Sequence, residues 1–243
     1  MARNIDFLAI DCGNTSIKIG LFENGMLTKV LRFDPEQLED VKAIAAAYIT
    51  SSKAMVSVAS FDLTEKLLEI FPETYNVGSQ SKVPFTVAYE TPYTLGSDRI
   101  CNAAALASMS CVGYKVSIDI GTCIKFDVLD DKNNYLGGSI APGIRLRYKS
   151  LNDYTANLPL LYEQGHLPLI GKNTTSSIQS GVINGIQAEI DGMIVKYEAE
   201  YQGLTFFVTG GDALCFDFAG KNNIFVDENL TLKGLEIIYS LNA

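Results

Sequence analysis

The sequence contains one pattern twice: a hydrophobic strand that ends in an aspartate, a glycine turn, and a second hydrophobic strand. The first copy reads IDFLAID, CGNT and SIKIGLF, and the second reads YKVSID, IGTC and IKFDVLD. Asp119 and Gly121 stand 108 positions after Asp11 and Gly13, and a further strand is predicted after each copy. A repeat of whole supersecondary units is harder to produce by chance than a short motif. We therefore interpret the chain as a duplicated domain with a boundary near Gly113.

Strands and helices alternate around the two copies. The pair Asn24-Gly25, set between alternating hydrophobic runs, predicts a hairpin. Asp34, Pro35 and Gln37 have the pattern of an N-cap, a first-turn proline and a capping-box partner, which predicts a helix start. Helices are predicted from Asp34 to about Ser51, from Ser97 or Asp98 onward, from about Thr174 to Tyr201, and from about Thr231. This alternation is typical of an α/β fold with mixed sheets covered by helices.

Charge and composition exclude several classes of function. The net charge of −9, from 28 acidic and 19 basic residues, offers no positive surface for a nucleic-acid backbone. No stretch has the roughly 18 uncharged apolar residues of a membrane span, and the N-terminus has too short an apolar run for a signal peptide. The five cysteines are scattered and form no CxxC pair, which favours reduced thiols in a cytoplasmic protein. A Ser/His/Asp triad would have to use the sole histidine, His166, whose loop GHLPLIG does not favour that role.

The two glycine turns have the composition of phosphate-binding loops. In DCGNT and DIGTC, backbone N–H groups and a threonine hydroxyl can point at phosphate oxygens, and each aspartate then needs a cation between itself and a phosphate. Ordinary turns also contain this pattern, but its recurrence at matching places favours a nucleotide site. Lys18 can reach a β- or γ-phosphate, and the alternative is a solvated strand lysine. The sequence has no GxxxxGK[ST] and no GxGxxG after a strand, which excludes an ordinary P-loop and a dinucleotide fingerprint.

The segment YETPYTLGSDRICNAAALASMS places Gly96, Asp98 and Arg99 at the start of a predicted helix. Ser97 or Asp98 can serve as the N-cap, which is a purely structural role. An adjacent acid and arginine in a glycine-bearing loop can also activate a hydroxyl group and clamp an anionic one. GGSIAPG and TGGDA add two places where glycine lets a ligand approach the backbone, although turns alone would also explain them.

Taken together, these motifs resemble the type III pantothenate kinase family, within the superfamily of actin-like and sugar-kinase-like ATPases. The resemblance covers nearly the whole chain. It is carried by DCGNTSIK at 11–18, YETPYTLGSDR at 89–99, DIGTC at 119–123, GGSIAPGIRL at 137–146, NTTSSIQSG at 173–181 and TGGDA at 209–213. Six motifs in this order are far more specific than any one of them.

The resemblance implies an α/β fold of two tandem ribonuclease-H-like domains, 1–113 and 114–243, with a cleft between them, as in actin-like ATPases. It implies ATP-dependent phosphorylation of pantothenate to 4'-phosphopantothenate, the first step of coenzyme A biosynthesis, by a homodimer. Mg²⁺ would accompany ATP, and a monovalent cation, K⁺ or NH₄⁺, would be required. GGSIAPGIRL would lie near the subunit interface.

Carried over residue by residue, the resemblance assigns Asp98 as the general base and Asp119 as the ligand of the monovalent cation. The residues that would bind ATP are Asp11, Cys12, Gly13, Asn14, Thr15, Ser16, Ile17, Lys18, Thr122, Gly210 and Gly211. The residues that would bind pantothenate are Tyr89, Gly96, Ser97, Asp98, Arg99 and Thr174.

The sequence departs from the family pattern in the second loop. The family usually continues DxGTA with threonines, whereas Cys123, Ile124 and Lys125 follow here. We expect the small cysteine to be tolerated and the new charge of Lys125 to alter the affinity for ATP. Two other functions stay open: a nucleotide-binding regulatory protein that has kept the fold without kinase turnover, and a phosphatase of the same superfamily that transfers to water.

Overall fold

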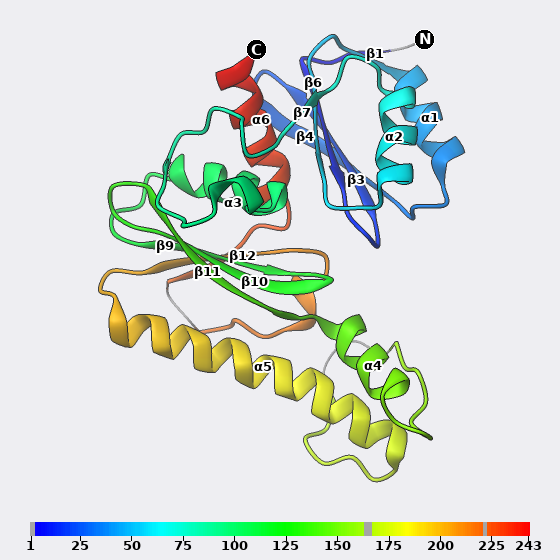
Figure 1. Cartoon of the computed structure of the whole chain (residues 1–243), viewed down its shortest axis with the longest axis vertical. Helices are drawn as coiled ribbons and strands as arrows, with labels where there is room; N and C mark the ends of the chain where they lie inside the picture. The colour runs from blue at the N-terminus through cyan, green and yellow to red at the C-terminus, as the bar shows by residue number, and fades with distance from the viewer. Residues whose placement is uncertain (1–2, 163–166, 221–222) are drawn as a thin grey trace. The chain divides into compact units, whose positions relative to one another are not determined.

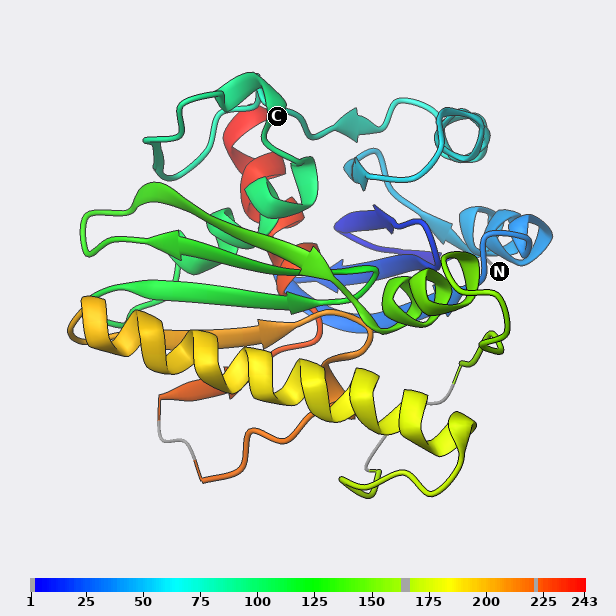
Figure 2. The same cartoon turned by 60° about the horizontal axis from the view of Figure 1, so that its bottom comes forward.

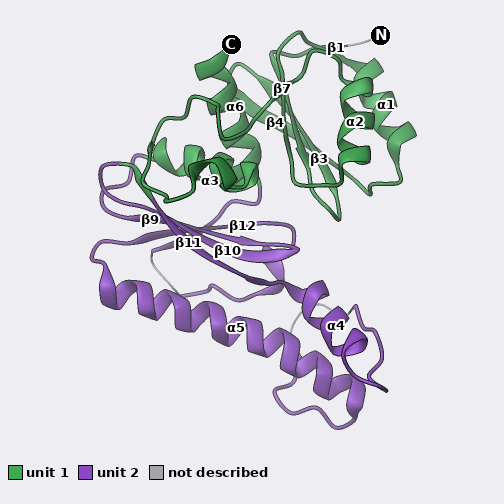
Figure 3. Ribbon diagram, viewed as in Figure 1, with its two compact units in different colours: residues 1–109, 133–135, 229–243 green, residues 110–132, 136–228 purple. Residues whose placement is uncertain are grey.

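The computed structural model describes residues 3–162, 167–220 and 223–243 of the 243-residue chain (Figure 1). The chain forms two compact units, each of which is described by itself (Figure 3). Unit 1 comprises residues 1–109, 133–135 and 229–243, and unit 2 comprises residues 110–132 and 136–228. His166 lies outside the described residues.

The sheet of unit 1 is built on the first copy of the repeat. Its strand order is β4-β3-β2-β6-β7, with β2 antiparallel to β3 and parallel to β6. The strands of this unit are β1 Arg3–Asn4, β2 Phe7–Cys12, β3 Ile17–Glu23, β4 Met26–Phe33, β5 Tyr48–Ile49, β6 Lys53–Ser57, β7 Tyr75–Asn76 and β8 Thr86–Val87. Asn24 and Gly25 both have positive φ between β3 and β4, which confirms the predicted hairpin turn.

The helices of unit 1 correct several sequence predictions. They are α1 Leu38–Ala47, α2 Phe61–Ile70, α3 Ser97–Ala107 and α6 Leu230–Asn242, with a short 3₁₀ turn η1 at Pro92–Thr94. The predicted start of α1 at Asp34 is wrong, because Gln37 N–H donates to the Asp34 carbonyl and closes a separate turn before the helix. Its predicted end near Ser51 is also wrong, since the chain passes into β5 at Tyr48. The sequence pattern did not identify α2, whose N-cap is Ser60.

The C-terminal helix α6 belongs to unit 1. It approaches α3 so closely that a Cβ atom at Gly234 would collide with the backbone of Cys101. Tyr239 of α6 also packs against Phe7 of β2 and Tyr75 of β7, with ring centroids 5.0 and 6.4 Å apart. The domains 1–113 and 114–243 were predicted from the repeat alone, and a repeat does not specify which sheet the C-terminal helix covers. This division therefore stays a prediction about the duplicated sequence.

The sheet of unit 2 is built on the second copy. Its strands are β9 Lys115–Ile120, β10 Cys123–Leu129, β11 Asn134–Pro142, β12 Thr205–Thr209 and β13 Ile224–Val226, in the order β13-β12-β9-β10-β11. The first residues of β11, 134–135, belong to unit 1 and pair there with β8. β9 is antiparallel to β10 and parallel to β12, so a hairpin and a crossover strand recur as in unit 1.

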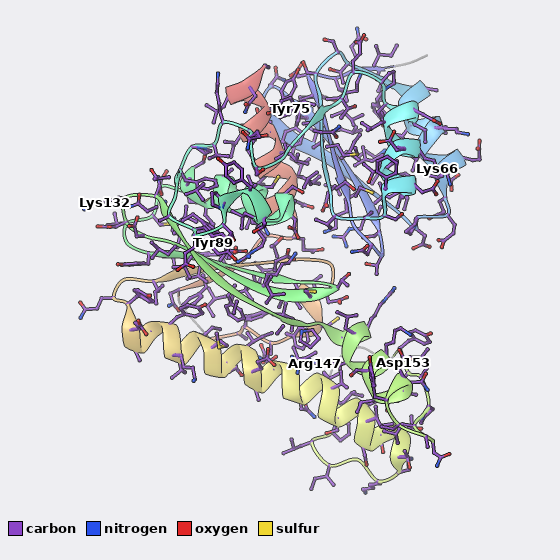
Figure 4. The ribbon with its side chains drawn as sticks, in the orientation of Figure 1. Lys66, Tyr75, Tyr89, Lys132, Arg147 and Asp153 are labelled. Carbon is purple, nitrogen blue, oxygen red and sulfur yellow. The ribbon has the colours of Figure 1, made fainter. Side chains whose placement is uncertain are left out.

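Helices cover one face of the unit 2 sheet. α5, Thr174–Glu200, runs along this face (Figures 1 and 2), and its extent confirms the predicted long helix. Ile186 and Ile190 of α5 share a buried core with Val116 and Ile118 of β9. Arg147 extends from α4, Ile144–Asp153, toward α5 (Figure 4), where it forms an ion pair with Glu189. A short 3₁₀ turn, η2, Ala213–Cys215, follows β12.

The opposite face of β9 is polar and nevertheless buried. Lys115, Ser117 and Asp119 alternate with the apolar residues of the strand, and each is at most 9% exposed. Charged side chains are rarely buried unless they are paired or functional. This face is therefore a candidate for chemistry.

The described part of the chain contains no helix that combines the length and the apolar character needed to cross a bilayer. The five cysteines all lie in that part, and the structure joins none of them in a disulfide.

Candidate active site

The first candidate loop joins β2 to β3. Asp11 lies opposite Lys18 in the strand register, and the turn between the strands is closed by Gly13 N–H donating to the Ser16 carbonyl at 3.0 Å. A Cβ atom at Gly13 would lie 3.2 Å from that carbonyl, so glycine suits the tight turn. The predicted ATP-binding residues from Asp11 to Lys18 are thus brought together in one hairpin, with Asn14 and Thr15 exposed at its tip.

Cys12 lies at the base of this loop and is fully buried. Burial raises the pKa of the Cys12 thiol above its ordinary value, and the charge of Asp11 adds to the rise, against a hydrogen bond with Ser57 that lowers it. The thiol therefore stays neutral at neutral pH. It adds no second negative charge beside a loop that is a candidate for binding phosphate.

The start of α3 lies near the first loop. Ser97 Oγ donates a hydrogen bond of 3.3 Å to the carbonyl of Ser57, the β6 residue that pairs with Cys12. Burial raises the pKa of the Cys101 thiol well above its ordinary value, and the charges of Asp11 and Asp98 raise it further. The contact between Ser97 and Ser57 brings the start of α3, with the predicted general base Asp98, next to the strand that pairs with Cys12.

The predicted capping role of Ser97 or Asp98 is wrong. The N-cap of α3 is Gly96, and no side chain accepts a hydrogen bond from the helix at that position. Ser97 is instead used in the contact with Ser57, while Asp98 Oδ1 accepts from the N–H of Arg99 at 2.9 Å. Asp98 thus lies within the first turn, where the helix dipole favours a negative charge.

Arg99 packs against a pair of aromatic rings. Its guanidinium carbon lies 5.8 Å from the centroid of the Tyr89 ring and 5.9 Å from that of the Tyr135 ring. The two rings meet edge to face with centroids 5.9 Å apart, and Arg99 is only 5% exposed. The sequence pattern found Tyr89 but missed Tyr135, because a tyrosine at the start of a predicted strand looks like an ordinary core residue.

The second candidate loop joins β9 to β10 through Gly121 and Thr122. Backbone contacts surround it, since Gly143 N–H donates to the Thr122 carbonyl at 3.0 Å. A Cβ atom at Gly143 would collide with the carbonyl of Gly121, and one at Gly210, where φ is +102°, would collide with the backbone of Ile120. The structure therefore places the Gly210-Gly211 turn against Ile120, directly before the loop that contains Thr122, although the turn and Thr122 were predicted separately as ATP ligands.

Asp119 is paired with a lysine across the hairpin. Lys125 lies opposite Asp119 in the register of β9 and β10, and its Nζ is 2.7 Å from Asp119 Oδ2. Only 14% of the Lys125 side chain and 12% of the Asp119 side chain are exposed. Thr209 of β12 is the register partner of Asp119 on the other side.

Thr174 belongs to unit 2. It is the exposed first residue of α5, whose N-cap Asn173 forms a capping box with Ser176. Within the described residues, no hydrogen bond joins Thr174 to Thr122 or to the Gly210-Gly211 turn.

The described residues contain no cluster of three or more histidine, cysteine, aspartate or glutamate side chains that would form a metal cage. Mg²⁺ is commonly held by one or two carboxylates together with the phosphates of a substrate. A single carboxylate such as Asp11 at the end of a strand fits this second kind of site.

Comparison with known proteins decides the family. The sequence model of the type III pantothenate kinase family matches residues 7–196, which include both copies of the repeat. The chain belongs to the type III pantothenate kinase family. Relatives of that name come from Christiangramia forsetii, 38% identical over 238 residues with 97% of this chain and 98% of the relative covered, and from Flavobacterium johnsoniae, 38% identical over 240 residues with 96% of each covered.

Solved structures agree on the fold of this chain. A Baf family protein from Campylobacter jejuni has a TM-score of 0.60 at 23% identity, with 97% of this chain and 98% of that chain covered. The inorganic polyphosphate/ATP-glucomannokinase from an Arthrobacter strain has a TM-score of 0.52 at 16% identity, with 99% and 100% covered. At these identities the likeness concerns the fold alone, and it confirms the predicted α/β fold of the actin-like and sugar-kinase-like ATPases.

Proposed function

We propose that this protein transfers the γ-phosphoryl group of ATP to the primary hydroxyl of pantothenate, giving 4'-phosphopantothenate and ADP, the first step of coenzyme A biosynthesis. Membership of the family supports the reaction. The observation that carries it is the hydrogen bond from Ser97 Oγ to the Ser57 carbonyl, which joins the start of α3, where Asp98 lies, to the strand that pairs with Cys12 at the first loop. An acceptor hydroxyl at Asp98 then lies near a loop that binds phosphate.

Each unit contributes proposed ligands of ATP. In unit 1, the N–H groups and hydroxyls of the Asp11–Lys18 hairpin would bind phosphate oxygens, with the Lys18 ammonium at the β- or γ-phosphate. In unit 2, Thr122 would bind phosphate, and the Gly210-Gly211 turn would accept the adenosine part. A kinase that uses ATP requires a divalent metal, which we propose is Mg²⁺ held by Asp11 and the phosphates. When bound, Mg²⁺ neutralises charge on the β- and γ-phosphates.

Asp98 is the proposed general base. The transition state of phosphoryl transfer is loose, so the acceptor proton leaves late, and positioning and electrostatics supply most of the acceleration. Asp98 does not need a strongly basic carboxylate for this task. It needs the position that the first turn of α3 gives it.

Arg99 is the proposed ligand of the pantothenate carboxylate. Its guanidinium packs against the rings of Tyr89 and Tyr135, which limits its movement and favours a fixed, directional contact with an anion. Tyr89, Gly96 and Ser97 would complete the pocket from the same segment. Thr174 would add a contact from α5.

A positive charge beside Asp119 is the last proposed part of the site. The family resemblance assigns K⁺ or NH₄⁺ to this carboxylate. In this chain Asp119 already contacts the ammonium of Lys125. An exchangeable cation and the Lys125 ammonium are therefore alternative sources of the positive charge beside Asp119.

We also propose a homodimer that uses the segment 137–146 at its interface. Ile140 on β11 is 61% exposed, and Leu146 on α4 is also exposed, which supports a partner on this face. Light scattering at micromolar protein should therefore give about twice the mass of one chain. A mass near 26.5 kDa would contradict the dimer.

The proposed reaction is tested by leaving out one component at a time. ADP should form only when ATP, a divalent ion and pantothenate are all present. Equal ADP release without pantothenate would favour a phosphatase, and no ADP release in the complete mixture would favour a regulatory protein without turnover. We place this reaction in the cytoplasm, which the free thiols support.

A further inference from the structure

The ion pair between Lys125 and Asp119 is held by the backbone. The two residues face each other across neighbouring antiparallel strands that are joined by a two-residue turn, so the strand register fixes their Cα atoms as partners. Three other pairs, Lys42–Glu39, Lys66–Asp62 and Lys149–Asp153, lie along single helices with each side chain at least 40% exposed. Burying a lysine and an aspartate together costs solvation for both, so such a pair by itself is poor evidence for a stabilising role.

The position of the pair points to a functional role. Asp119 is two residues before the Gly121-Thr122 turn, and its neighbour in β12, Thr209, comes directly before Gly210. The pair thus lies at the base of both turns that we propose as ATP ligands in unit 2. In unit 1, Asp11 and Lys18 are likewise register partners across β2 and β3.

An exchangeable cation does not fit well at the same carboxylate. Lys125 Nζ occupies hydrogen-bond distance from Asp119 Oδ2, and its charge balances that of Asp119. A K⁺ or NH₄⁺ ion at this oxygen would then meet an ammonium group instead of a net negative charge. The ion would then lack the electrostatic attraction that offsets the free-energy cost of removing its hydration water.

We propose that the Lys125 ammonium replaces the exchangeable monovalent cation, so that this enzyme requires a divalent ion with ATP but neither K⁺ nor NH₄⁺. This proposal rests on the proposed kinase function. The lysine supplies a permanent single positive charge at the base of the second loop. It also accounts for the departure from the family pattern, in which Cys123, Ile124 and Lys125 follow the loop.

The test compares the wild type with Lys125→Met and with the matched control Lys132→Met. Lys132 is an exposed lysine in the turn after the same strand (Figure 4). Rates of pantothenate-dependent ADP release are measured in choline chloride, KCl and NH₄Cl at equal ionic strength, so that general screening is the same. Wild type and Lys132→Met should work equally well in the three salts, within about twofold. Lys125→Met should lose at least about tenfold in choline chloride and recover most of this in KCl or NH₄Cl, because a diffusible ion can then occupy the vacated place.

Thermal unfolding without ATP gives a second, independent readout. An ion that binds the folded protein raises its melting temperature, so KCl should raise the melting temperature of Lys125→Met above its value in choline chloride and leave that of the wild type unchanged. Activation of the wild type by K⁺ of several-fold, or a K⁺-specific rise in its melting temperature, would overturn the proposal. Loss of activity in a folded Lys125→Met that neither salt restores would also overturn it, and would make Lys125 a direct ligand of ATP. If the kinase proposal itself failed, no pantothenate-dependent ADP would form in any of the three salts. The melting temperatures would still show whether K⁺ binds beside Asp119.

Discussion

Replacing Asp98 with asparagine is expected to lower kcat by about two to four orders of magnitude, the usual scale for removing a general base. Asparagine has nearly the same shape but cannot accept the proton of the substrate hydroxyl. The KM values for ATP and pantothenate should change much less than kcat, because the contacts that bind both substrates are kept. Steady-state kinetics with each substrate varied in turn measures this difference.

Asp62→Asn is the matched control for Asp98→Asn. Asp62 is the second residue of α2, as Asp98 is of α3, so both substitutions remove a charge from the first turn of a helix. That loss costs about 0.3–1 kcal/mol of stability and should leave kcat unchanged in Asp62→Asn. If Asp98→Asn lost less than about tenfold in kcat, Asp98 would be structural.

Replacing Arg99 with methionine is expected to raise the KM for pantothenate by a factor of about 30 to several thousand, from the 2–5 kcal/mol that the loss of a buried charged partner costs in a complex. Methionine keeps much of the apolar stem of the side chain but leaves the substrate carboxylate without its guanidinium. The KM for ATP should change little. Arg99→Lys should restore only part of the affinity, because an ammonium group lacks the planar fork that packs against the rings of Tyr89 and Tyr135.

An alcohol analogue of pantothenate, with hydroxymethyl in place of the carboxylate, makes this prediction specific. Wild type and Arg99→Met should have similar KM values for the analogue, because it has no anion for Arg99 to bind. A loss of equal size with pantothenate and the analogue would mean that Arg99 supports the pocket structurally.

The strand and turn pattern could be predicted from the sequence because it is local. Asp11, Gly13 and the apolar alternation around them fixed the first hairpin, and their recurrence at Asp119 and Gly121 fixed the second. Helix ends were less predictable where a side chain had a choice of partners. The N–H of Asp34 donates to the side-chain oxygen of Gln37 at 2.8 Å, which closes a turn at 34–37. The helix α1 therefore begins after this turn and not at Asp34.

The sequence could predict which residues belong to the candidate site but not which partners their side chains contact. Ser97 looked like an N-cap, yet its hydroxyl donates to Ser57, which lies 40 residues earlier in the chain. Lys125 looked like an extra charge near the second loop, and its contact with Asp119 depends on the length of the turn between β9 and β10. Tyr135 meets Arg99 only because β11 begins within unit 1. The contacts of Ser97 and Tyr135 are set by packing between distant segments, and that of Lys125 is set by the strand register, and the local sequence pattern contains neither.

The fate of the γ-phosphoryl group tests the central claim most directly. The purified enzyme is given γ-³²P-labelled ATP, a divalent ion and pantothenate. The reaction is stopped before the pantothenate is used up, and the products are then separated. We predict that the label leaves ATP in step with ADP formation and is found on 4'-phosphopantothenate, with a negligible share in inorganic phosphate. Label found in inorganic phosphate at the same rate with and without pantothenate would contradict the account.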